Sequence, residues 1–165
     1  MSTTKMIELL KKLYTLHAAL HQLAIKKTEI LKTGDIPSLD EHLKEEQKYI
    51  LAIRQLENER IELMNQEFHR LGIRHQEQTL TSYIEKTNEP ERTTLTQLQQ
   101  EFVDKINELK AQNELNQQLT SQSLQVVNMT LDTILPKPKE LNYGNPLNAP
   151  KEQNTQRRSM FDSQA

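Results

Sequence analysis

The chain has no cysteine and no tryptophan among its 165 residues, and it has only 3 glycines. The absence of cysteine excludes disulfide bonds, thiolate catalysis and zinc sites held by thiolates. Aromatic residues make up only 4% of the chain, and runs of β-branched residues are few, which argues against a β-sheet. We therefore expect an all-α protein, and the length is that of one domain.

Long apolar runs and an excess of one charge are also missing. No window approaches the roughly eighteen apolar residues that a membrane span needs. The N-terminal stretch is already interrupted by Glu8, Lys11 and Lys12, so we expect no signal peptide. The formal net charge is −2, which gives no support to nucleic-acid binding. These features predict a cytoplasmic protein without direct membrane insertion.

Motifs for catalysis and cofactor binding are absent as well. The sequence has no glycine-rich phosphate loop, no HExxH motif and no serine in a nucleophile setting. His17 and His21 are four residues apart, a spacing that suits a metal, but no third ligand accompanies them. His42, His69 and His75 lie among charged residues and are predicted to be exposed to solvent. We expect no enzyme activity, no cofactor and no metal site.

The most prominent feature is a stretch from Glu91 to Leu135 without glycine or proline. Pro90 precedes it and Pro136 follows it. Proline is tolerated in the first turn of a helix but cannot continue one. The pattern predicts a helix over residues 91–135 with Asn88 as its N-cap, about 67 Å long at 1.5 Å per residue.

The apolar seam of this predicted helix changes midway. It starts with apolar residues three or four positions apart, then passes through polar residues and becomes apolar again. The three sets are Leu95, Leu98, Phe102, Ile106 and Leu109; Asn113, Asn116, Thr120 and Ser123; and Val127, Leu131 and Ile134. Two interpretations stay open: a polar layer that fixes the register of a bundle, or a groove for another protein's helix, where amides pair and leucines anchor.

Two further long helices are predicted before it, over residues 4–33 and 38–71. The first carries a heptad seam broken only by Lys27, formed by Met6, Leu9, Leu13, Leu16, Leu20, Leu23, Lys27 and Ile30. Gly34 should end it in a left-handed conformation. Ser38 with Glu41 is one candidate cap of the second helix, and Asp35 is the competing cap. Charged residues interrupt the apolar stripe of the second helix at Glu46, Glu57 and Arg60.

Short connections should make the first two helices antiparallel neighbours, with the third packed along them by its N-terminal half. A short helix over about 79–87 connects the second and third long helices. We expect an elongated antiparallel helical bundle or coiled coil over residues 1–135. Four of the chain's six prolines lie in residues 136–165, which predicts a flexible tail with isolated docking motifs.

The order of these features resembles a known family. The N-terminal leucine heptads are followed by Glu45-Glu46-Gln47-Lys48-Tyr49-Ile50-Leu51, by Asn113, Asn116 and Leu119, by Leu135-Pro136 and by Asn142-Tyr143-Gly144. This arrangement is similar to the FlgN family of flagellar type III export chaperones, in the version found in Gram-positive bacilli. There the chain also ends in a Phe-Asp-Ser segment, as Phe161-Asp162-Ser163 does here. The resemblance covers essentially the whole chain, although helical heptads alone are not specific.

The resemblance implies a chaperone that binds the terminal helical regions of hook–filament junction subunits, the hook-associated proteins of the FlgK and FlgL type. It would prevent their premature assembly and deliver them to the export gate protein FlhA. The resemblance places Asn113, Asn116 and Leu119 in the cargo-binding part and Tyr143 at the gate. The full cargo-binding prediction is Gln112, Asn113, Leu115, Asn116, Leu119, Thr120, Ser123, Val126, Val127, Leu131 and Ile134. Met160 and Phe161 are candidate docking residues of the tail.

One alternative is a structural coiled-coil or scaffold protein that acts through self-association. In that case the same apolar seams are satisfied between copies of the chain. A homodimer of the free chaperone is a related expectation, because an uncovered seam favours pairing with itself. A third class is a small helical protein that is itself secreted, which would make the C-terminal tail an export signal.

Overall fold

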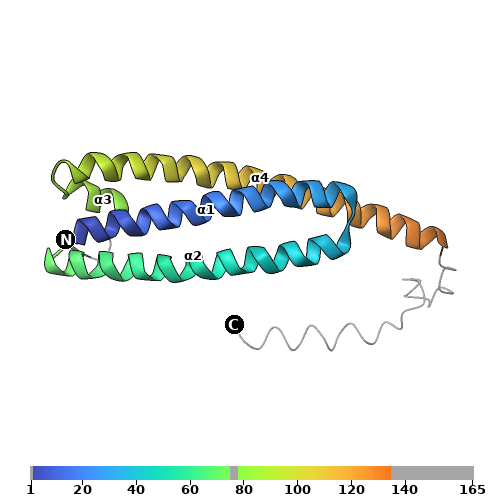
Figure 1. The fold of residues 1–165 in the computed structure, drawn as a ribbon, viewed down its shortest axis with the longest axis horizontal. Coiled ribbons are helices and arrows are strands. Elements are labelled where there is room, and N and C mark those ends of the chain that lie inside the picture. Colours follow the sequence, from blue (N-terminus) through green and yellow to red (C-terminus); the bar gives the residue numbers. More distant parts are fainter. Residues whose placement is uncertain (1, 75–77, 135–165) are drawn as a thin grey trace, which may run out of the picture. The chain divides into compact units, whose positions relative to one another are not determined.

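The computed structural model describes residues 2–74 and 78–134. Every regular element in these residues is a helix: α1 (Ser2–Thr33), α2 (Ile36–Arg70), α3 (Leu80–Glu85) and α4 (Glu91–Ile134) (Figure 1). This confirms the predicted all-α class with three long helices and a short one. None of the described helices is both long and apolar enough to cross a membrane. The chain divides into two units, Met1–Leu124 and Gln125–Ala165, which are described separately below.

The turn between α1 and α2 is fixed by a glycine and an aspartate. Gly34 has φ +70°, the left-handed conformation expected at the end of α1. Asp35 is the N-cap of α2, and its carboxylate accepts a hydrogen bond from the Ser38 N–H at 3.2 Å. Hydrogen bonds from the Ser38 hydroxyl and backbone lower the pKa of Asp35. Of the two competing caps, Asp35 is therefore the one used, and α2 begins two residues earlier than predicted.

The start of α4 agrees with the sequence in position but not in its cap. Glu91 is the first helical residue, as predicted. The capping side chain is that of Glu89, whose carboxylate accepts hydrogen bonds from the Thr93 N–H at 3.2 Å and the Thr93 hydroxyl at 2.7 Å. Asn88 contributes its backbone carbonyl to the Arg92 N–H. The prediction of Asn88 as the capping side chain was wrong, because the longer glutamate spans Pro90 to reach the first turn.

The apolar core lies where the start of α1, the end of α2, α3 and the start of α4 meet. Phe68 and Leu95 are 0% exposed, and the rings of Phe68 and Tyr83 pack edge to face at 6.2 Å between centroids. Figure 1 shows α3 at this end of the first unit, between α2 and α4 in the view. The buried members of this cluster are Met6, Leu9, Leu10, Leu63, Met64, Phe68, Tyr83, Ile84 and Leu95.

The seam of α1 packs as its heptad spacing predicts. All eight seam positions are buried or half-buried, including Lys27. α1 and α2 are antiparallel neighbours joined by the short turn at Gly34 (Figure 1). The predicted boundary between a bundle over residues 1–135 and a tail over residues 136–165 lies outside the described residues.

Candidate functional site

A polar layer joins α1 to the middle of α4. Asn116 is only 4% exposed, and its amide nitrogen donates a hydrogen bond to the Ala24 carbonyl at 2.9 Å. Its amide oxygen accepts from the Thr28 hydroxyl, which in turn accepts from the side-chain amide of Gln112. A buried amide whose donor and acceptor are both satisfied favours one register of the two helices. For Gln112 and Asn116, the structure therefore matches the polar-layer interpretation.

Further toward the start of α4, aromatic and charged residues complete its contact with α1. The ring of Phe102 packs edge-on against His17 at 4.9 Å and lies near Tyr14 at 6.3 Å. His21 Nδ1 lies 3.6 Å from Glu108 Oε2, and a hydrogen bond from Lys105 lowers the pKa of Glu108. His17 and His21 thus lie in a helix–helix interface. Within residues 2–74 and 78–134, no group of three or more His, Cys, Asp or Glu side chains is placed to hold a metal ion.

The charges that interrupt the apolar seams of α1 and α2 pair with each other. Lys27 Nζ lies 3.1 Å from Glu46 Oε2. His42 lies one turn before Glu46 on the same face of α2 and is only 5% exposed, with Nε2 3.5 Å from Glu46 Oε1. The predicted exposure of His42 was wrong, because its charged sequence neighbours point outward while His42 faces α1. His69 is exposed, as predicted, and His75 lies outside the described residues.

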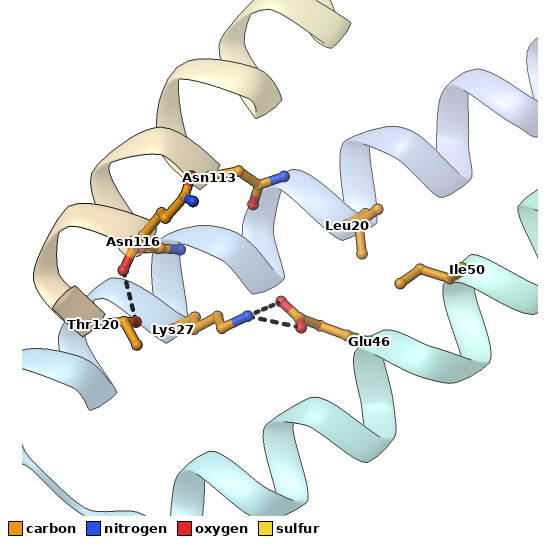
Figure 2. Close-up of a pocket in the computed structure, with 8 residues that line it drawn as sticks. Leu20, Lys27, Glu46, Ile50, Asn113, Asn116 and Thr120 are labelled. Carbon is orange, nitrogen blue, oxygen red and sulfur yellow. Dashed lines mark hydrogen bonds and ion pairs between the residues drawn. The ribbon is translucent and has the colours of Figure 1, made fainter. Parts of the chain in front are cut away.

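A cavity of about 300 Å³ opens beside the polar layer, between α1, α2 and α4. Figure 2 shows the Lys27–Glu46 pair reaching from α1 to α2, with Leu20 and Ile50 near each other farther along the same two helices. The lining residues are Leu20, Lys27, Glu46, Ile50, Asn113, Asn116, Gln117 and Thr120. Because lysine and glutamate offset each other, the lining is mixed polar and apolar without net charge.

The residues predicted to bind cargo fall into two groups. In the first unit, Asn116 is buried and Gln112 and Leu119 are half-buried, while Asn113, Leu115, Thr120 and Ser123 are exposed. In the second unit, the predicted residues Val126, Val127, Leu131 and Ile134 of α4 are exposed, and so is Met129, which was not among the predicted residues. Tyr143, Met160 and Phe161 lie outside the described residues, so their roles stay predictions.

Sequence reasoning missed the part of the cavity that α1 and α2 supply. Leu20, Glu46 and Ile50 line it, yet no site residue was predicted on α2 from the sequence. One signal was available, because Lys27 and Glu46 each break an apolar seam with opposite charge. A charge in a helical seam is expected to find a partner across the interface.

The fold is that of an all-α helical protein, and the comparisons with known proteins identify its family. The sequence model of the FlgN protein family matches residues 1–151. The chain belongs to the FlgN family of flagellar export chaperones, which is a chaperone family and not an enzyme family. The uncharacterized protein YvyG of Bacillus subtilis (strain 168) is 37% identical over 167 residues, covering 100% of both chains. No solved structure gives a significant match.

Proposed function

We propose that this protein is a cytoplasmic chaperone that binds the terminal helical regions of hook-associated proteins, prevents their premature assembly and delivers them to the export gate. Family membership supports a general flagellar export chaperone role and an interaction with hook-associated proteins. The observation that carries the finer proposal is a row of exposed apolar side chains on the last part of α4. We call residues Val126, Val127, Met129, Leu131 and Ile134 the terminal apolar row.

The terminal apolar row has the composition of a helix-binding surface. Its side chains are between 45% and 72% exposed. Val127, Leu131 and Ile134 are four and three residues apart, the spacing of one helical stripe. Covering one such side chain stabilises a complex by about 1–2 kcal/mol, so an amphipathic helix laid along the row gains from several of them.

The surroundings of the row also favour a foreign helix over self-association. From Leu115 to Leu131, α4 carries no charged residue and many amides. An exposed seam made only of leucine would pair readily with itself, whereas amides lower that tendency and require a matched register. Such a surface suits cargo that must be released, because the affinity that it provides per buried area is modest.

We further propose that the predicted cargo residues have different tasks. Gln112 and Asn116 already hold α4 to α1, so we assign them a supporting role. We propose that the terminal apolar row makes the main cargo contacts. A separate set of proposed cargo contacts lies in the first unit: Asn113, Leu115, Thr120 and Ser123, which are exposed, and Leu119, which is half-buried. Tyr143 is proposed as the contact with the gate protein FlhA.

The experiment compares two aspartates introduced one residue apart, Val127→Asp and Asn128→Asp. Binding of the purified full-length variants to purified hook-associated proteins of the FlgK and FlgL type is measured by calorimetry. Val127→Asp places an unpaired charge against the apolar face of the cargo helix and should weaken binding at least tenfold, whereas Asn128→Asp should change it less than about threefold. Equal affinities for the two variants would contradict the proposal.

Two further measurements test the scaffold alternative and the proposed gate contact. A tight dimer held through the terminal apolar row, which cargo does not disrupt, would favour the scaffold; light scattering with and without cargo measures this. Tyr143→Ala should leave cargo binding unchanged and lower the amount of cargo exported to the culture medium. A loss of cargo binding in Tyr143→Ala would instead place this residue in the cargo surface.

A further inference from the structure

The short helix α3 shows how the space between α2 and α4 is filled at one end of the first unit. Tyr83 and Ile84 of α3 are buried in the same apolar cluster as Phe68 of α2, Leu95 of α4 and Met6 of α1. Thr81, also on α3, accepts a hydrogen bond from the Gln99 side chain of α4 at 3.1 Å. A fourth helical element therefore completes the packing of the three long helices at this end (Figure 1).

The same face of α2 is open farther along. Positions 43, 50, 57 and 64 are seven residues apart and share a face of the helix. Met64, at the end covered by α3, is 7% exposed, whereas Ile50 is 37% and Leu43 is 44% exposed. Glu57, which pairs with Arg60, interrupts this face. Beyond it the apolar residues Ile50 and Leu43 continue the face, and within the described residues no chain element covers them fully.

The side of α4 that faces the cavity is likewise covered at the α3 end and open farther along. Gln99, Ile106, Asn113 and Thr120 are also seven residues apart. Gln99 contacts α3, whereas Ile106 is 42% exposed and Asn113 and Thr120 line the 300 Å³ cavity. On both helices, the face that packs around α3 at one end is unfilled at the other. We call this unfilled part the α2–α4 groove, with Leu20 and Lys27 of α1 among its lining residues.

We propose that the α2–α4 groove takes a short amphipathic helix of the cargo, placed in line with α3, so that bound cargo completes a four-helix arrangement. This inference rests on the proposed function and adds a second contact surface to the terminal apolar row. The occupant we propose is a short partner helix, because at the other end of the bundle the same two helices pack around a helix, α3. A second copy of the chain is the competing occupant, which the test below distinguishes.

The chemistry of the groove lining predicts which residues the guest helix should carry. Leu20, Ile50 and Leu43 offer apolar surface. Asn113 and Gln117 make no side-chain hydrogen bonds to the described part of the chain. The Lys27–Glu46 pair leaves no net charge in the groove. A guest with aliphatic residues on one stripe and an amide or hydroxyl beside Asn113 and Gln117 fits this lining, whereas a charged residue there would lose hydration without a partner.

The test uses two matched pairs of neighbouring residues in the full-length chain. Ile50→Lys and Gln117→Glu alter the groove, while Leu51→Lys and Gln118→Glu place the same charges one residue away from its lining. Affinity for purified full-length hook-associated proteins is measured by calorimetry, and circular dichroism verifies that each variant melts as a folded helical protein. The groove variants should bind at least about fivefold more weakly, and the neighbours should stay within about twofold of the unmodified chain.

A second measurement reads the groove directly. Because the chain has no cysteine, Ile50→Cys and Leu51→Cys each accept one environment-sensitive fluorophore. Adding cargo should bury the label at position 50 and leave the label at position 51 exposed. This result supports the groove even if one charged variant alters folding.

The outcomes separate this inference from the proposed function. The groove alone is overturned if Val127→Asp weakens cargo binding while the groove variants bind as well as their neighbours and the label at position 50 does not respond. No binding by the unmodified chain overturns the proposed function and this inference together. Burial of the label at position 50 that rises with the concentration of the chain alone would assign the groove to a second copy and overturn its assignment to cargo.

Discussion

The two ends of the bundle in the first unit are built from the same three long helices but by different chemistry. At the α3 end, Phe68 and Leu95 are fully buried in a continuous apolar cluster. Toward Gly34, the buried Leu23 and Ala24 are accompanied by the Lys27–Glu46 pair and the Thr28–Asn116 hydrogen bonds, beside an open cavity. The comparison teaches that one end of the bundle provides stability and the other provides a defined but unfilled surface.

The two ends differ because apolar burial and polar contacts contribute free energies of different size to stability. Apolar burial contributes about 25 cal/mol per Å², which adds up over the nine buried residues of the α3 end. A satisfied hydrogen bond contributes a net of only about 1 kcal/mol, and a half-buried ion pair offsets its own desolvation at best. The polar end therefore fixes the register of the helices at little gain in stability.

The largest expected effect is on the α3 end. Phe68→Ala removes the largest fully buried side chain and should lower the free energy of unfolding by about 3–5 kcal/mol. Leu51→Ala, at a side chain that is 52% exposed, is the control and should stay within about 0.5 kcal/mol. Urea denaturation followed by circular dichroism measures both. A loss below about 1 kcal/mol for Phe68→Ala would show that stability is not concentrated at this end.

An intermediate effect is expected at the polar layer. Asn116→Leu has a similar volume but removes both hydrogen bonds of the buried amide and leaves the Thr28 hydroxyl with one partner fewer. Unfolding free energy should fall by about 1–2 kcal/mol, whereas Asn113→Leu, at an exposed position, should change it little. The same urea titrations apply. A gain in stability for Asn116→Leu would mean that this layer specifies register at the expense of stability.

The smallest effect is expected at the turn that closes the polar end. Asp35→Asn keeps a good N-cap but removes the charge that the Ser38 hydrogen bonds stabilise. Because the pKa of Asp35 is lowered in the folded state, its contribution is present above its unfolded value of about 3.9 and is lost as the pH falls through the folded value. The melting temperature of Asp35→Asn should be slightly lower at pH 7, and the difference should vanish in acid. A difference that persists below both pKa values would contradict this assignment.

Much of the fold was predictable because its signals are local. The turns at Gly34 and Gly72 both have positive φ, as glycine at a helix end predicts. The start of α4 at Glu91 followed from the proline before it. Two predictions that relied on sequence neighbours were wrong. His42 has charged neighbours in sequence and is nevertheless buried, and Glu89 provides the cap that was expected of Asn88.

The sequence by itself determined the helical segments, their ends and the stripes that face inward. These follow from the 3.6-residue period and from the backbone limits of proline and glycine, which act within a few residues. Only the tertiary structure decided that Asn116 is buried while Asn113 lines a cavity, and that Lys27 meets Glu46. On one helix, Asn113 and Asn116 are equivalent polar positions; the position of the neighbouring helix separates them, because an amide is buried only where a facing chain satisfies its hydrogen bonds.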